Sequence, residues 1–373
     1  MQRNISVSWR QRSLSAALMT ALGVNLLPSP LLAAEPAAMA TQPAITSVLA
    51  AQSVMLSVAR AGQRLVAVGE RGFIIVSDDN GGSWKQVPSP VSTTLVKVRF
   101  VDDRQGWAVG HCAIVLHTAD GGSSWAVQLD GVRAADLELQ AATLASTAAA
   151  DPARAEEQTA QAQQLVDDGP DKPFLDLWFQ DARHGLVVGA YGLAFTTEDG
   201  GASWQPIRTH LDNPQGLHLY SIIAAGKDIF VGGEQGILLR SSDLGQTFEA
   251  LAPPYEGTIF GLQATANGVL AFGLRGKAYA STDRGDSWQR LDTLQPVTLT
   301  SALALADGSV LLTDESGRVL KLGADLRTLT LQQSSPAGYL TGLVEAANGQ
   351  LITSSARGVD VLASAAQTPE LAQ

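Results

Sequence analysis

The stretch that decides the fold is Val66–Trp84, VAVGERGFIIVSDDNGGSW. It predicts two short strands joined by a tight V-G-x-x-G turn, then an acidic, glycine-rich turn that ends at an aromatic residue. The same nineteen-residue pattern recurs at Trp107–Trp125, Leu186–Trp204, Phe230–Phe248 and Leu270–Trp288. The chain is therefore built from copies of one supersecondary unit.

The spacing of these copies predicts the architecture. The second glycine position of the tight turn falls at Gly72, Ala113, Gly192, Gly236 and Gly276, and two weaker copies without the aromatic residue follow at Gly317 and Gly358. The intervals are 41, 79, 44, 40, 41 and 41 residues, so one interval is doubled. A period near forty residues with four short strands per unit is typical of a β-propeller. The sequence predicts an all-β fold over residues 45–365, a seven-bladed β-propeller of four-stranded antiparallel blades.

The second unit shows the strands expected in each blade. Its inner strand is predicted at Leu95–Val101, where Val96, Val98 and Phe100 alternate with lysine and arginine. The other three strands are predicted at residues 107–110, 114–118 and 125–129.

The last unit, residues 339–362, has sequence for only three strands before a short tail at 366–373. We expect Ile45–Leu49 to supply its fourth, outermost strand, because such closure removes open sheet edges.

The doubled interval contains an insertion, residues 131–173. It is rich in alanine and glutamine, and Asp151-Pro152 divides it into two potential helices, Ala134–Ala149 and Ala153–Val166. We expect a helical hairpin that packs on the propeller, with a surface loop as the alternative.

The N-terminus has the pattern of a secretory signal. Arg3, Arg10 and Arg12 precede the apolar stretch Leu14–Leu32, and small residues follow at Ala33–Ala34. We therefore predict a signal peptide at 1–34, a spacer at 35–44 and a periplasmic location. An uncleaved anchor is the alternative, which Pro28 and Pro30 argue against.

Charge and cysteine content limit the partners. Loss of residues 1–34 changes the formal net charge from −11 to −14, which disfavours binding to nucleic acid or to anionic lipid headgroups. Cys112 is the only cysteine, so no internal disulfide can form. We expect a monomer without cofactors, and an inert, partly buried thiol at Cys112.

Five units share the motif S/T-x-D-x-G-x-S/T-W/F, which resembles the Asp boxes of bacterial neuraminidase-type repeats. We expect each aspartate to accept hydrogen bonds from its own turn, and each aromatic residue to fill the gap between adjacent sheets. Because one active site does not need five equivalent carboxylates, we interpret the boxes as structural. Their residues are Asp79, Asp120, Asp199, Asp243 and Asp283, with Trp84, Trp125, Trp204, Phe248 and Trp288.

The resemblance extends to nearly all of the expected mature chain. Residues Val98–Trp125 resemble the repeat of the photosystem II stability/assembly factor family of seven-bladed propellers, with Ala113 replacing its second glycine. The resemblance implies an exported, non-catalytic scaffold that assists assembly or operation of a membrane protein complex. For a non-photosynthetic bacterium, it implies the extracytoplasmic domain of a membrane transporter as a partner. The 131–173 insertion and the last two units, which lack the Asp box, depart from the family pattern.

We find no catalytic or metal-binding pattern. The five histidines show no zinc spacing. A glycan-binding or sialidase-like propeller is the alternative function, since Asp boxes occur in sialidases. Such a hydrolase needs a tyrosine nucleophile assisted by a glutamate, and Tyr255-Glu256 is the only adjacent pair of that type.

The V-G-x-x-G turns indicate a binding face. In a propeller these turns and the links between blades lie on one face, and here they vary in charge and size, as a surface that recognises a partner would. Free drift of exposed turns is the alternative. The candidate residues are Arg71, His111, Tyr191, Gln235, Arg275 and Arg357.

Overall fold

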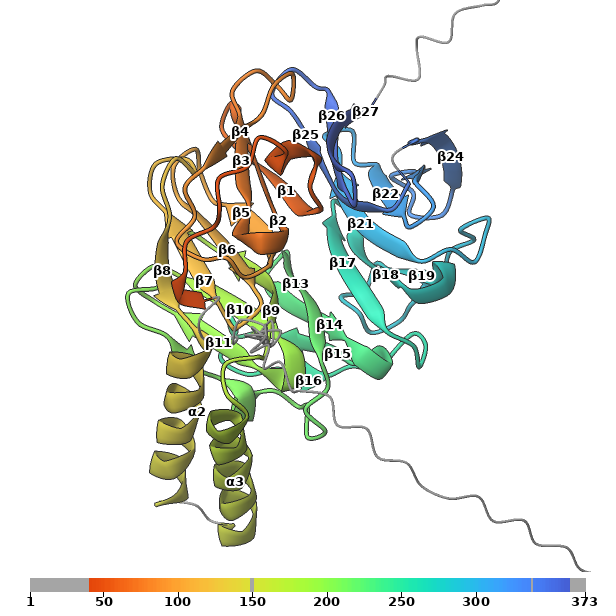
Figure 1. Cartoon of the computed structure of the whole chain (residues 1–373). Coiled ribbons are helices and arrows are strands. Elements are labelled where there is room, and N and C mark those ends of the chain that lie inside the picture. Colours follow the sequence, from red (N-terminus) through yellow and green to blue (C-terminus); the bar gives the residue numbers. More distant parts are fainter. Residues whose placement is uncertain (1–39, 148–150, 337, 363–373) are drawn as a thin grey trace, which may run out of the picture. The chain divides into compact units, whose positions relative to one another are not determined.

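The computed structural model describes residues 40–147, 151–336 and 338–362 (Figure 1). The predicted signal peptide at 1–34, the first part of the spacer and the tail at 366–373 lie outside these residues. Neither of the two described α-helices is long and apolar enough to cross a membrane.

The described residues form seven antiparallel sheets that follow one another along the chain, which confirms the seven-bladed β-propeller. Six sheets have four strands and the last has three. The first, inner strands are β1 (Met55–Ala61), β5 (Leu95–Phe100), β9 (Phe174–Phe179), β13 (Leu219–Ala225), β17 (Ile259–Thr265), β21 (Leu299–Ala304) and β25 (Leu340–Glu345). The second strands are β2 (Arg64–Gly69), β6 (Gly106–Gly110), β10 (Gly185–Gly189), β14 (Asp228–Gly233), β18 (Gly268–Gly273), β22 (Val310–Asp314) and β26 (Leu351–Ser355).

The third and fourth strands complete the blades. The third strands are β3 (Ile74–Ser77), β7 (Val115–Thr118), β11 (Ala194–Thr197), β15 (Leu238–Ser241), β19 (Ala278–Ser281), β23 (Arg318–Leu322) and β27 (Gly358–Leu362). The outer strands are β4 (Lys85–Val87), β8 (Ala126–Leu129), β12 (Gln205–Pro206), β16 (Glu249–Ala250), β20 (Gln289–Arg290) and β24 (Leu329–Ser334).

The inner strands make the ring. Each inner strand contacts the inner strand of the next blade, and β25 contacts β1. At this junction the Thr341 hydroxyl donates a hydrogen bond to the Met55 carbonyl oxygen at 2.6 Å. The ring is thus closed by strands from opposite ends of the chain.

The prediction that Ile45–Leu49 completes the last blade is wrong. This segment lies along the first blade, where the Ser47 N–H donates to Gln86 Oε1 and Gln86 Nε2 donates to the Ile45 carbonyl oxygen, each at 2.8 Å. The Gln86 side chain thus supplies the polar partners that the main chain would otherwise seek at a sheet edge. Within the described chain, the last blade therefore has only β25, β26 and β27.

A β-bulge interrupts every inner strand, which corrects the predicted alternation in the second blade. Leu95 and Val98 are buried, whereas Val96 between them is only half-buried, because the register shifts by one residue there. The shift occurs at the same place in all seven blades. The bulged residues are Leu56, Val96, Leu175, Tyr220, Phe260, Thr300 and Thr341, all of them half-buried.

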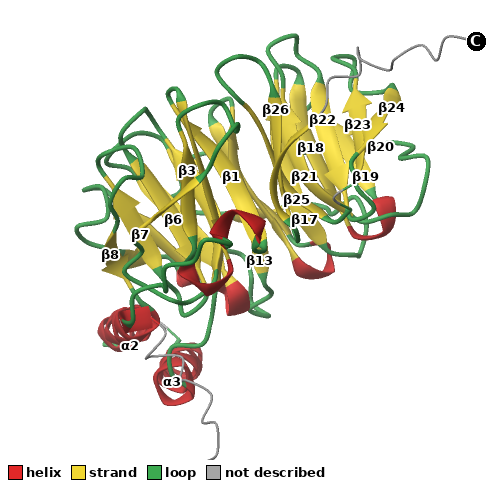
Figure 2. Ribbon diagram, turned by 45° about the horizontal axis from the view of Figure 1, so that its top comes forward, coloured by secondary structure: helices red, strands yellow, loops and turns green. Residues whose placement is uncertain are grey.

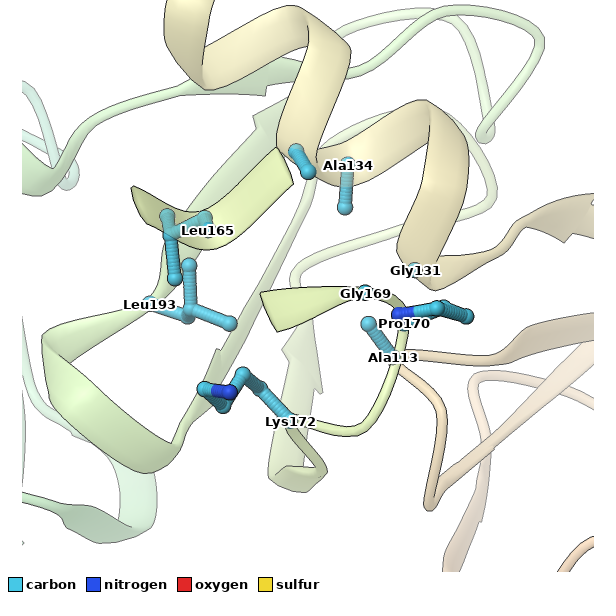
Figure 3. A pocket seen from close by; sticks show the side chains of 9 residues that line it. Ala113, Gly131, Ala134, Leu165, Gly169, Pro170, Lys172 and Leu193 are labelled. Atoms are coloured by element: carbon cyan, nitrogen blue, oxygen red, sulfur yellow. The ribbon is translucent and has the colours of Figure 1, made fainter. Parts of the chain in front are cut away.

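The insertion forms the predicted helical hairpin, α2 (Gly131–Ser146) and α3 (Pro152–Asp168). The side chains of Asp130 and Asp151 cap the two helices by accepting hydrogen bonds from main-chain N–H groups three residues ahead, at 2.9 and 3.2 Å. At the root of the hairpin, Ala134 and Leu165 are buried against the core of blades 2 and 3 (Figure 3). The cavity between them is only about 10 Å³, so the root is closely packed.

The loops divide between two faces. The turns between second and third strands and the links between blades, α2 and α3 included, lie at one end of the sheets (Figure 2). We call this end the turn face, and define it by the turns at residues 70–72, 111–113, 190–192, 234–236, 274–276, 315–317 and 356–357 and by the inter-blade links. The opposite end carries the Asp boxes and is called the box face.

Candidate binding face

On the box face, the residues of each Asp box form hydrogen bonds with one another. In the first box, Asp79 Oδ1 accepts from the Ser77 hydroxyl and from the Ser83 N–H, each at 2.8 Å, and Oδ2 accepts from the Ser83 hydroxyl at 2.6 Å. The Gly81 N–H donates to the Ser77 hydroxyl at 2.8 Å. The other four boxes repeat these bonds around Asp120, Asp199, Asp243 and Asp283.

These hydrogen bonds also hold the box carboxylates in the ionised form. Hydrogen bonds from the Ser83 hydroxyl, the Ser83 N–H and the Ser77 hydroxyl lower the pKa of Asp79 to about 2. Such a carboxylate is neither a proton donor nor a base near neutral pH. Among the described residues, no group of three or more acidic, histidine or cysteine side chains is arranged to hold a metal ion.

On the turn face, one hydrogen bond recurs in all seven blades. The first residue of each turn donates its N–H to the carbonyl oxygen of the residue just before the inner strand of the same blade. The pairs are Glu70 with Val54, His111 with Thr94, Ala190 with Pro173, Glu234 with His218, Leu274 with Thr258, Glu315 with Thr298 and Ala356 with Tyr339. The turns are therefore anchored at fixed positions around the ring.

The middle residue of the turn is left-handed in blades 1 to 5. The φ angles there lie between 53° and 59°, although none of the five residues is glycine. They are Arg71, Cys112, Tyr191, Gln235 and Arg275. This conformation costs a non-glycine residue roughly 1–2 kcal/mol, so the turn geometry alone does not explain the side chains.

All six predicted face residues are exposed on the turn face, but the structure does not gather them into one patch. Arg71 and His111 share a hollow of about 370 Å³ with Asp171, which follows the hairpin. Gln235 lines a second hollow of about 350 Å³ with Pro214 and Pro253. Tyr191, Arg275 and Arg357 line neither.

Cys112, and not His111, occupies the left-handed position of the second blade. The thiol is buried, and its Sγ lies 3.5 Å from Thr93 Oγ1. Burial raises the pKa of the thiol, so it is mainly protonated at neutral pH.

An aromatic ladder, which sequence reasoning missed, leads from Tyr191 to the inner strands. The Tyr191 N–H donates to His218 Nδ1 at 3.0 Å and the two ring centroids lie 4.7 Å apart. His218 is followed by Tyr220 at 6.4 Å, and Tyr220 by Phe260 at 5.4 Å. Tyr220 and Phe260 are bulged residues, and the sequence signal for them is a pair of consecutive large residues where strict alternation is expected.

The inner strands also carry a charged group that the sequence did not indicate. Asp176 on β9 is buried and accepts from the Ile222 N–H at 3.0 Å, and its carboxylate lies 3.3 Å from the Arg99 guanidinium. Lys97 lies nearby on β5, and burial lowers its pKa against the opposing effect of Asp176. These contacts tie blades 2, 3 and 4 together.

Tyr255 and Glu256 do not form a hydrolase site. The Tyr255 hydroxyl donates to the main-chain carbonyl oxygen of Thr258, and its ring stacks on Tyr279 at 5.4 Å. Burial raises the pKa of Tyr255 to about 12, opposite to what an activated phenolate nucleophile needs. The pair therefore forms part of an inter-blade link.

Comparison with known proteins identifies the family. The model of the family described as "Photosynthesis system II assembly factor YCF48" matches residues 76–147 and 155–363. The "Photosystem II assembly lipoprotein Ycf48" of Synechococcus sp. (strain CC9902) is 32% identical over 122 residues, which is 31% of this chain and 35% of that protein. The "Photosystem II stability/assembly factor HCF136, chloroplastic" of Arabidopsis thaliana is 26% identical over 157 residues, 40% of this chain and 39% of that protein. The matched segments thus span under half the length of these relatives.

Solved structures support the fold. "YCF48 bound to D1 peptide" superposes with a TM-score of 0.59 at 16% identity and covers 85% of this chain and 97% of its own. The WD40 β-propeller domain of Doa1 gives 0.59 at 10% identity, covering 86% and 94%. At these identities the structures show a shared propeller fold. Because the family model covers most of the sequence, the chain belongs to the photosynthesis system II assembly factor YCF48 family.

Proposed function

We propose that this protein is an exported, non-catalytic scaffold whose turn face binds a membrane protein and assists assembly or operation of its complex. The observation that carries the proposal is the set of four exposed, left-handed, non-glycine residues on this face, Arg71, Tyr191, Gln235 and Arg275. Glycine would relieve each of these positions of strain, so side chains that persist there favour recognition over turn formation.

The side chains at these positions are available to a partner. Arg71, Gln235 and Arg275 are exposed, and among the described residues their side chains make no hydrogen bond or ion pair. Unpaired cations and an amide on a rigid ring can bind carboxylates and main-chain groups of another protein without a prior rearrangement. The family relatives act in photosystem II assembly by name, and a family structure holds a D1 peptide, which supports a membrane protein as the partner.

The partner in a non-photosynthetic bacterium would be the extracytoplasmic domain of a transporter or similar complex, which the scaffold meets in the periplasm. The signal-like sequence at 1–34 supports export, as does the lipoprotein name of the Synechococcus relative.

In-cell photo-crosslinking tests the proposal. Crosslinkers placed at Gln235 and Arg275 on the turn face are compared with crosslinkers at the exposed residues Asp103 and Arg183 on the box face. We expect one integral membrane protein to be captured from the turn face only. The combined variant Arg71→Gly, Gln235→Gly and Arg275→Gly, which keeps the left-handed turns, should lose this capture. Equal capture from both faces, or full capture by the triple variant, would refute the turn-face site.

A further inference from the structure

Among the described residues, the last blade leaves open the edge of a strand that is covered in every other blade. In blades 3, 4 and 5 the carbonyl oxygens of Ala194, Leu238 and Ala278 accept hydrogen bonds at 2.8–2.9 Å from the chain of the fourth strand. By the register of the sheets, Val359 on β27 corresponds to these residues. No strand in 40–147, 151–336 or 338–362 pairs with the outer edge of β27. The N–H and C=O groups of Val359 and, two residues on, Val361 therefore face outward.

One residue on this strand departs from the pattern of the ring. Asp360 occupies the centre of β27 and is exposed. The residues at the same register position in the other six third strands are large, apolar or aromatic, and at most 8% exposed. They are Ile75, Leu116, Phe195, Leu239, Tyr279 and Leu320. The chain thus carries a carboxylate where a fourth strand would lie alongside.

An open strand edge is a template for another extended chain, which adds through main-chain hydrogen bonds. A residue opposite Asp360 on the added strand would have its side chain on the same face of the sheet, so charge complementarity favours lysine or arginine there. Val361 beside it is 40% exposed and offers an apolar contact.

Within residues 40–147, 151–336 and 338–362, the chain does not supply such a strand. Residues 13–59 and 363–373 contain no lysine or arginine, so these two stretches offer no basic residue to lie opposite Asp360. A second copy of β27 paired about its centre would place Asp360 against Asp360, and like charges directly opposite each other are destabilising. A different protein is the occupant that fits.

We propose that β27 is a strand-addition site, where an extended segment of the partner completes the last blade with a basic residue opposite Asp360. This inference rests on the proposed scaffold function and adds a second contact with the partner, at the blade edge.

Two nine-residue peptides of alternating valine and threonine serve as probes, one with a central lysine and one with a central glutamate. Amide hydrogen exchange by NMR on the purified full chain reports pairing at Val359 and Val361, and fluorescence anisotropy gives the affinity. We expect the lysine peptide to slow exchange at both amides and to bind about fivefold more tightly than the glutamate peptide. Asp360→Lys should reverse the preference.

Val361→Pro removes an outward N–H while the bonds to β26 remain, so it should abolish binding of the lysine peptide. Val127→Pro is the matched control, since Val127 lies on the outer strand β8 and is 41% exposed, and it should leave binding unchanged.

Three results would overturn the inference. The first is that neither peptide slows exchange, or that Asp360→Lys leaves their relative affinities unchanged. The second is exchange that is slow without peptide and speeds up when residues 363–373 are removed, which assigns the edge to the chain's own tail. The third is protection that grows with protein concentration, which assigns it to a second copy.

The proposed function fails separately. Full capture by the triple glycine variant, or equal capture from both faces, would refute the turn-face site and leave the peptide result untouched. If capture from the turn face is normal but no peptide protects β27, only the strand-addition site is lost.

Discussion

Blades 1 to 5 and blades 6 and 7 have the same strand order but are held together in different ways. The first five use one repeated device, an Asp box that ends in an aromatic residue between neighbouring sheets. Blade 6 instead buries an ion pair at its turn, where Arg318 Nε donates to Asp314 Oδ2 at 2.6 Å. Blade 7 has neither device among its described residues. The difference teaches that the ring requires a wedge-shaped blade of the right width, which several local solutions can provide.

The largest expected effect comes from removing the aromatic side chain at the end of an Asp box. Trp125 is 8% exposed, contacts Phe100 edge-on at 6.2 Å and donates its indole N–H to the Gly122 carbonyl oxygen at 3.1 Å. Trp125→Ala should lower the free energy of unfolding by about 3–5 kcal/mol. Leu331→Ala on the outer strand of blade 6, where the side chain is 51% exposed, should cost below about 1 kcal/mol. Urea denaturation measures both, and equal losses would remove the distinction between the two groups of blades.

The junction of blades 2 and 3 has an additional contact, the hairpin. Glu138 on α2 is 6% exposed, its Oε1 has no hydrogen-bond partner among the described residues, and burial raises its pKa to about 7 despite the nearby Arg208. Because the folded state binds this proton more tightly than the unfolded state, stability should fall as pH rises from about 4.5 to about 7.

Glu138→Gln should remove this dependence and stabilise the protein at pH 8 by roughly 1–3 kcal/mol. Urea denaturation at pH 5 and pH 8 measures it. Asp136→Asn, at an exposed position on the same helix, is the control. A pH-independent difference between Glu138→Gln and the unchanged protein would contradict the assignment.

Glycine substitution in a left-handed turn should have a smaller effect of opposite sign, an increase in stability. The backbone of Arg71 has a left-handed conformation, whereas that of Arg357 in blade 7 does not. Arg71→Gly should therefore stabilise the protein by roughly 0.5–1 kcal/mol, after allowance for the greater freedom of glycine in the unfolded chain. Arg357→Gly should give no gain. Thermal unfolding compares the pair, and a loss of stability in Arg71→Gly would show that its side chain supports the fold.

The smallest expected effect is on the stability of the protein at low pH. The pKa of each box aspartate is lowered to about 2 from an ordinary value of 3.8. The unfolded chain thus binds more protons between these values, so the contribution of the boxes is present above about pH 4 and is lost as pH falls through 2. Asp283→Asn should reduce the loss of melting temperature between pH 5 and pH 2.5, whereas Asp103→Asn, outside the boxes, should not.

The sequence was sufficient for the architecture because the repeat is local. The spacing from Gly72 to Trp84 fixes a turn, a strand and a box in each unit, and the same spacing recurs in the structure. The division of the insertion into two helices could also be predicted, since Asp151-Pro152 is a strong helix start.

Features that depend on distant residues could not be predicted. The path of Ile45–Leu49 is set by the side chain of Gln86, forty residues away, and no pattern links the two. Burial of Glu138 depends on where the hairpin meets blade 3. The exposure of Asp360 becomes meaningful only when the register of all third strands is compared.

The closure of the ring by β1 and β25 has a consequence for biogenesis. These strands are separated by nearly the whole chain, and a chain is synthesised from its N-terminus, so β1 emerges long before its neighbour. Until the last blade arrives, the inner strand of the first blade faces solvent on one side, and non-local pairing of this kind is slow. The turn face acquires its complete set of seven turns only at that final step, so an incomplete chain cannot present the whole surface.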